Sequence, residues 1–224
     1  MDRRSRRVKA RTAQANQIRG LAAEFGIVIP QGIAKLRERL PRILEDAENA
    51  LPVLMRELLE RLHRRLQALD AEVRELEAHV VSWHRQNTQS RKLADIPGIG
   101  PLTASALVAS IGDAKTFQNG RQLAAWLGLV PRQHSSGGKP MLLGISKRGD
   151  AYLRTLLIHG ARAVLNAATK KADPSNRWLT QLAMRRHKNI AAVALANKNA
   201  RIVWALLKHG RTYSADYAAV KVAA

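Results

Sequence analysis

The side chains with the clearest chemical potential lie in a loop at residues 128–149. This loop contains the runs PRQHSSGGKP (131–140) and GISKRG (144–149), and it has no acidic residue. A serine hydroxyl here could attack the phosphorus of a phosphodiester while Lys and Arg side chains offset the charge of the transition state. The alternative is a loop whose hydroxyls only donate hydrogen bonds to a phosphate, and spacing alone favours that simpler role. The G-x-x-x-x-G-K-[ST] spacing of a Walker A loop is absent.

A glycine-rich turn precedes this loop. The segment LADIPGIG (93–100) leads into a run of small and apolar residues that includes Thr103. We expect Gly98 and Gly100 to allow positive φ and close approach to a phosphate, and the following helix to offer free N–H groups. This helix-hairpin-helix pattern would contact a DNA backbone without reading its sequence. A glycine-tightened turn without a ligand is the alternative.

These two segments define the predicted site. One nucleophile and a set of nucleic-acid contacts are expected, while no metal site is predicted because the seven His form no ligand-spaced pair with carboxylates. His134, close to the serines, is more typical of a solvated loop residue than of a base. The tryptophans Trp126, Trp178 and Trp204 fall in helical apolar patterns and are predicted to lie in the core. The predicted nucleic-acid-binding residues are Gly98, Gly100, Thr103, Arg132, Ser135, Lys139, Ser146, Lys147 and Arg148.

The charge of the chain points to a polyanionic partner. The 224 residues carry a net charge of +21, of which residues 1–90 contribute +5 and residues 91–224 contribute +16. Nucleic acid is the usual partner of such a protein. A membrane surface is disfavoured because aromatic residues make up only 4% of the chain. The absence of Cys excludes a disulfide scaffold, a thiolate zinc site and a Cys nucleophile. We find no run of eighteen uncharged apolar residues and no secretory signal, so a soluble, cytoplasmic protein without a membrane partner is expected.

The elements that position the site are predicted to be helical. Apolar residues recur at intervals of three and four from Leu51 to Val80, between Glu, Arg and Asp. This heptad pattern predicts a coiled-coil arm or a dimer seam, the alternative being a long amphipathic helix on a core. No convincing run of strands is found, so the fold class is mainly α. Further helices are expected at residues 8–25, 33–44, 101–110, 120–127, 150–169, 177–186 and 190–209.

The composition predicts four regions along the chain. A helical segment at 1–50 is followed by the coiled-coil arm at 51–88. A domain at 89–212 holds the glycine turn and the serine loop, and a tail occupies 213–224.

The motifs, taken in order, resemble the C-terminal part of IS110/IS1111-type (IS116/IS110/IS902) insertion-sequence transposases. The resemblance extends from about residue 8 to about residue 210. It rests on five runs: NQIRGLAAEFGIVIPQ (16–31), IPGIGPLTASALVASIGD (96–113), LAAWLGLVPR (123–132), SSGGK (135–139) and GISKRGD (144–150).

The resemblance implies a site-specific DNA recombinase. It places the nucleophile that forms a covalent DNA intermediate on Ser136, with the adjacent Ser135 as second choice. It also implies DNA and a guide RNA as partners, homo-oligomerisation through the coiled coil, and a bacterial, nucleoid-associated location. A RuvC-like acidic domain binding a divalent metal, expected to be Mg²⁺, would precede the segment resembled here.

This chain departs from the family pattern at its beginning. No strand-borne acids precede residue 8, so we expect a truncated or frameshifted copy that lacks the metal-binding acids and does not complete recombination alone. An alternative is a non-catalytic module that binds nucleic acid and dimerises. A basic protein of the ribosome or nucleoid would explain the charge but leaves the two motifs unexplained.

Overall fold

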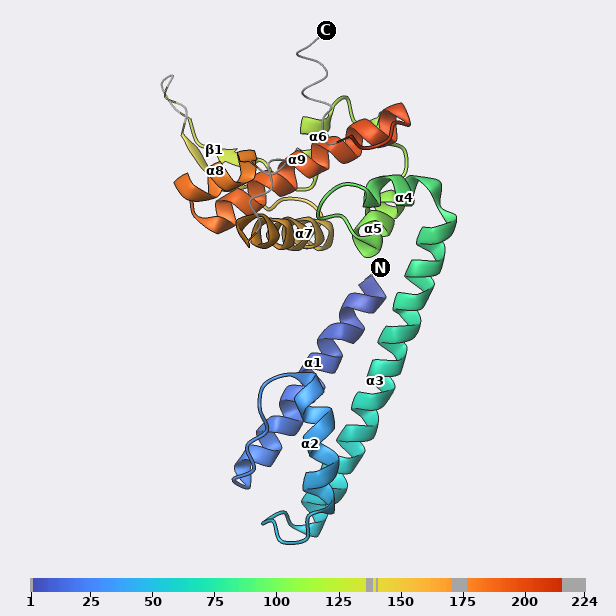
Figure 1. Ribbon diagram of the computed structural model, residues 1–224, viewed down its shortest axis with the longest axis vertical. Helices are drawn as coiled ribbons and strands as arrows, with labels where there is room; N and C mark the ends of the chain where they lie inside the picture. The colour runs from blue at the N-terminus through green and yellow to red at the C-terminus, as the bar shows by residue number, and fades with distance from the viewer. Residues whose placement is uncertain (1, 136–138, 140, 171–176, 215–224) are drawn as a thin grey trace. The chain divides into compact units, whose positions relative to one another are not determined.

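The computed structural model describes residues 2–135, 139, 141–170 and 177–214 (Figure 1). Helices predominate over these ranges, which confirms the prediction of a mainly α fold. The chain divides into two compact units, Met1–His79 and Val80–Ala224. The α-helices are α1 (Asp2–Glu24), α2 (Ile33–Glu45), α3 (Val53–Gln86), α4 (Thr88–Ala94), α5 (Pro101–Ile111), α6 (Gly120–Trp126), α7 (Ala151–Lys170), α8 (Arg177–Arg185) and α9 (Lys188–His209).

The first unit packs α1 and α2 against α3. Its core is made of aliphatic side chains spaced three and four residues apart on each helix, as an amphipathic helix requires. The largest of these side chains have no solvent-accessible surface: Ile18, Leu36, Leu40, Leu59 and Leu66.

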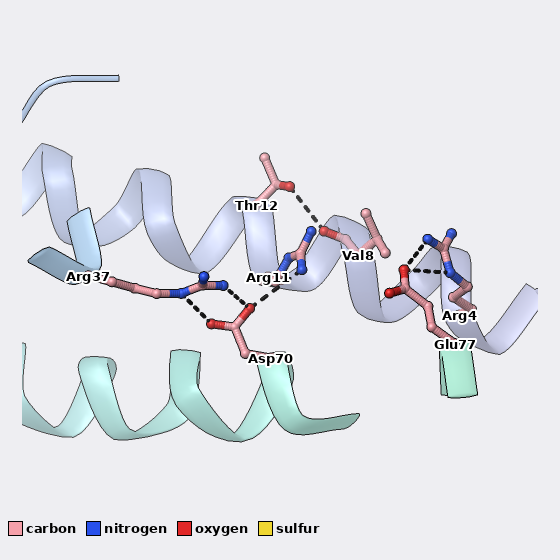
Figure 2. A network of polar contacts seen from close by, with 7 residues as sticks. All are labelled: Arg4, Val8, Arg11, Thr12, Arg37, Asp70 and Glu77. Atoms are coloured by element: carbon pink, nitrogen blue, oxygen red, sulfur yellow. Dashed lines mark hydrogen bonds and ion pairs between the residues drawn. The ribbon is translucent and has the colours of Figure 1, made fainter. Parts of the chain in front are cut away.

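Ion pairs join the basic face of α1 to the acidic residues of α3 (Figure 2). Arg4 pairs with Glu77, and Arg7 pairs with Glu72 at 2.6 Å. Asp70 is only 6% exposed and accepts a 2.8 Å hydrogen bond from Arg37 Nε of α2. Arg11 also reaches the Asp70 carboxylate, at 3.5 Å. A buried carboxylate needs such partners, since an unpaired charge would cost several kcal/mol. Arg11 of α1 and Arg37 of α2 therefore neutralise the buried Asp70 of α3.

The heptad positions of α3 are largely buried within this chain. Leu62, Leu66, Leu69 and Val73 are buried as the pattern predicts, whereas Leu58 is 37% exposed and its neighbour Leu59 takes the core position. Because α1 and α2 cover Leu59, Leu62 and Leu66, this part of the seam is an intramolecular core. A coiled coil with a second copy stays a prediction.

The second unit is built around α9. Small residues on α9 are fully buried and let α6 and α7 approach closely: Ala191, Ala192, Ala196 and Ala200. Asn87 begins α4 by accepting a 2.8 Å hydrogen bond from the Ser90 amide. By length and composition α9 could cross a membrane, although the buried core helix of a soluble protein passes the same test. The absence of a membrane partner therefore stays a prediction.

A small hairpin interrupts the predicted loop. Strands β1 (Pro131–Gln133) and β2 (Leu142–Ile145) are antiparallel, with Pro131 opposite Ile145 and Gln133 opposite Leu142. The Gly-, Ser-, Pro- and Lys-rich composition of this segment predicted a loop, and both strands are largely exposed. No alternation of buried apolar residues therefore marks them.

Candidate nucleic-acid interface

The serine loop joins the two strands of the hairpin, and its described residues extend the pairing of β1 with β2. His134 N donates to Met141 O at 2.9 Å, which continues the pairing beyond the strands. Ser135 Oγ then accepts hydrogen bonds from Gln133 Nε2 at 3.0 Å and from Met141 N at 3.2 Å. Ser135 is exposed, but its oxygen holds the two sides of the hairpin together. Ser136, the next residue in the sequence, lies outside the described residues.

The second half of the loop is fixed by its backbone against the end of α6. Ser146 N donates to Val130 O at 2.8 Å, and Lys147 N donates to Gly128 O at 3.2 Å. A Cβ placed on Gly128 would come within 2.0 Å of Arg148 O, so only glycine permits this crossing. Lys147 itself has φ +54°. The backbone is therefore constrained while the Lys147 and Arg148 side chains remain exposed.

The charged side chains exposed on and beside this hairpin are all basic among the described residues. Arg132, Lys139, Lys147 and Arg148 are all exposed, and none of them has an ion-pair partner among the described residues. The nearest acid in the sequence, Asp150, is engaged elsewhere, because its Oδ1 accepts from Tyr152 N at 2.7 Å and from Leu153 N at 3.0 Å at the start of α7. The structure thus leaves this set of cations without a carboxylate to neutralise it.

The glycine turn between α4 and α5 is packed into the second unit. Gly98 has φ +88°, as predicted, and a Cβ there would come within 2.9 Å of the backbone of Gly160 in α7. Asn199 of α9 also donates to Pro97 O at 2.9 Å. The close approach that Gly98 permits is therefore an approach to another helix of the same chain.

Two expectations for this turn need revision. Gly100 has φ −86° and ψ 177°, ordinary extended backbone, so the prediction of positive φ at Gly100 is wrong. Thr103 is 7% exposed, because its side of α5 faces the core and leaves the hydroxyl no open route to a phosphate in this conformation. Gly100 is exposed at the beginning of α5, so of the three predicted residues it is the one most accessible to nucleic acid.

Three aspartates of the described residues are engaged in contacts within the fold. Asp70 is paired with two arginines, Asp113 accepts from Lys115 N at 2.8 Å, and Asp150 caps α7. No three His, Asp or Glu side chains in the described part of the chain gather as ligands would.

Two of the three tryptophans predicted to lie in the core are substantially exposed. Trp178 was predicted to be a core residue, but its 44% exposure is too high for one, and Trp126 is 39% exposed. Trp204 is partly buried and donates from Nε1 to Phe117 O at 3.1 Å. The apolar spacing on the short helix α8 indicates an apolar face but does not tell whether that face is buried. The basic residues near Trp178 were the signal that could have indicated its exposure.

Comparison with known proteins agrees with the motifs. Residues 90–175 match the model of the transposase IS116/IS110/IS902 family. Over 94% of its length the chain is 51% identical to a protein described as a family 20 transposase of Pseudomonas aeruginosa, and it covers 62% of that protein. It is 47% identical to the transposase for insertion sequence element IS1111A of Coxiella burnetii, with 94% of this chain and 58% of that protein covered.

A third relative extends this pattern to another genus. The transposase for insertion sequence element IS1328 of Yersinia enterocolitica is 39% identical, with 92% of this chain and 61% of that protein covered. The chain therefore spans about three fifths of the length of these relatives. The part of the chain that contains the glycine turn and the serine hairpin thus matches the model of the IS116/IS110/IS902 transposase family, and nearly the whole chain is similar to part of each of these transposases.

Proposed function

We propose that this chain binds the DNA of an insertion sequence through the cationic serine hairpin and supplies Ser136 as the nucleophile of strand exchange. The observation that carries the proposal is the hairpin itself. Four exposed cations without an ion-pair partner among the described residues lie on or next to this hairpin in the sequence, and its backbone is anchored at both ends of the described part. This hairpin lies within the residues that match the family model.

The chemistry follows from the residue types. Ser136 Oγ would attack the phosphorus of a DNA phosphodiester and lose its proton to solvent or a neighbouring base. One bridging oxygen would then leave as a DNA hydroxyl and take up a proton, so that a phosphoserine diester holds the strand until another hydroxyl reverses the step. Cations at the hairpin would offset the charge that develops on phosphorus. Ser135 is less suited to this role because its oxygen already accepts two hydrogen bonds.

The carboxylates described above do not provide a metal site, so no step is assigned to a metal here. By resemblance to the family, we propose that acidic residues outside this chain hold Mg²⁺ and complete the active site. On the same basis a guide RNA is proposed as a partner and the bacterial nucleoid, within the cytoplasm, as the location.

The DNA affinity is expected to fall steeply with salt. Each neutralised phosphate contributes roughly 0.9 to the slope of log K against log salt concentration. Replacing both Lys147 and Arg148 with Ala should therefore reduce that slope by about 2. The matched control is Arg64→Ala with Arg65→Ala, which removes two exposed cations from α3. Its slope should stay close to that of the unaltered protein. Fluorescence anisotropy with duplex DNA at several salt concentrations measures the slope for both double variants. A flat salt response of the unaltered protein would contradict the proposal.

Self-association through α3 is a further proposal. Leu54 and Leu58 lie one turn apart on α3 and are 78% and 37% exposed, next to Val53 at 74%. We expect a dimer in sedimentation velocity at micromolar concentration, and we expect Leu54→Glu to shift it toward monomer. Unaltered protein that sediments only as a monomer would show that the heptad serves the intramolecular core alone.

A further inference from the structure

A groove with an unusual lining runs along α9 in the second unit. It lies between α8, α9 and the segment 210–214, and it encloses about 680 Å³. We name it the α9 groove, defined by Trp178, Lys198, Arg201, Ile202, Arg211 and Tyr213. None of these residues belongs to the serine hairpin, and the proposed strand-exchange chemistry does not use them.

The polar lining of the α9 groove is suited to anions. Lys198, Arg201 and Arg211 contribute to it, and no Asp or Glu is among its described lining residues. A second hollow of about 360 Å³ shares Arg201 with the groove and adds Arg121. Basic side chains therefore occur in two adjoining hollows beside Arg201. Phosphates of one strand could be neutralised along such a path.

The apolar lining is suited to planar rings. Trp178 is 44% exposed, although burying an indole is ordinarily favourable. Lys198 Nζ lies 5.0 Å from the centre of the Trp178 ring, a cation–π contact that orients the indole. Tyr213 supplies a second ring to the lining, and Ile202 supplies aliphatic surface. Proteins that bind single-stranded nucleic acid combine an exposed aromatic ring, on which a base stacks, with cations that contact the phosphates. The α9 groove has both.

We propose that the α9 groove binds an unpaired nucleotide of a single-stranded nucleic acid, with the base stacked against Trp178 and the phosphates held by Lys198 and Arg201. The groove would hold a strand while the hairpin contacts its own phosphodiester. The proposal rests on the proposed function, because it takes nucleic acid to be the partner of this chain. DNA and RNA share the required chemistry, and the test distinguishes them. An acidic peptide would use the cations but leave the indole without a ring to stack on.

The test is binding of a labelled single-stranded DNA and a labelled single-stranded RNA of equal length to the full 224-residue chain. Trp178→Ala should weaken binding of at least one strand about five-fold to 100-fold, the range for loss of one stacked base. Trp178→Phe should restore most of the affinity, because a phenyl ring still stacks. Trp83→Ala, which removes a tryptophan of similar exposure (40%) from α3, is the matched control and should have no such effect. Whichever strand loses more affinity identifies the preferred source.

Two further measurements keep the proposal open to refutation even if the Trp178 variant folds poorly. A 5-bromouracil oligonucleotide irradiated with the unaltered protein should cross-link to Trp178 or Tyr213, identified by mass spectrometry. An abasic oligonucleotide with the same number of phosphates should bind more weakly than the strand with bases. Cross-links that avoid the α9 groove, or equal binding of the abasic strand, would overturn the proposal. If duplex DNA binding persists in that case, the groove assignment fails alone, whereas unaltered protein that binds no nucleic acid overturns the proposed function as well.

Discussion

Replacing Ser136 with Ala is expected to abolish covalent attachment of DNA while leaving DNA binding intact. Loss of a nucleophile typically reduces the rate by roughly 10⁴-fold or more, because no other group can form the covalent intermediate. Affinity should persist because the exposed cations Arg132, Lys139, Lys147 and Arg148 are retained. The measurement requires a partner polypeptide that supplies the acidic domain and a labelled DNA substrate. Attached DNA is detected as a band that survives denaturing electrophoresis.

Ser135→Ala is the matched control for this experiment. Its hydroxyl accepts from Gln133 and Met141, so its loss should loosen the hairpin and reduce the yield of attached DNA without eliminating it. Attachment that survives Ser136→Ala and disappears in Ser135→Ala would move the nucleophile to Ser135. Attachment that survives both changes would refute a serine nucleophile at this loop. A substrate that is never attached by the unaltered protein, despite tight binding, would favour the non-catalytic binding module.

The largest expected effect on stability comes from Gly160→Ala. Glycine in the middle of a helix is usually unfavourable, so alanine in α7 would ordinarily stabilise the helix by about 1 kcal/mol. Here the new Cβ would lie 1.8 Å from Gly98 O, a backbone atom that cannot rotate away. The turn and α7 would have to separate. We expect a loss of about 3 kcal/mol or more, equivalent to a fall in melting temperature of roughly 10 °C for a unit of this size.

Two other glycines provide controls in the same chain. Gly20 also lies inside a helix, α1, but a Cβ there meets no atom within 4 Å. Gly20→Ala should therefore stabilise the first unit by about 0.5–1 kcal/mol. Gly100→Ala should be close to neutral because its φ of −86° suits alanine and its surroundings are open. Thermal unfolding followed by circular dichroism measures all three variants. Equal stability of Gly160→Ala and the unaltered protein would show that the turn does not depend on this contact.

Periodicity predicted most of the helices but not α4, which begins where a break was expected. The heptad of residues 51–80 predicted a long helix, and the break at Asn87 is where α3 ends and α4 begins. The partner of that heptad was not predictable from periodicity, because a seam packs equally well against a second copy or against helices of its own chain. The hairpin at Pro131–Gln133 and Leu142–Ile145 was also missed, since exposed strands carry no alternating apolar pattern.

The candidate site, too, was predictable in part from the sequence. The residue types alone indicated phosphate binding by the serine loop, and it was the resemblance to the transposase family that singled out Ser136 as the nucleophile. The role of the glycine turn depends on which helix packs against it. The run IPGIG does not reveal that Gly98 contacts Gly160, more than sixty residues later in the chain. Trp178 was assigned to the core because helical spacing reveals that a face is apolar but does not reveal what covers it.

By itself, the sequence determined the helical class, the basic second part of the chain and the series of motifs shared with the transposase family, since these depend on composition and on local order along the chain. Only the tertiary structure decided that Gly98 serves packing, that Thr103 is buried, that Ser135 closes the hairpin and that Trp178 faces a basic groove. The physical reason is that burial and close approach are properties of pairs of segments far apart in the chain. They arise only when those segments compete for the same core.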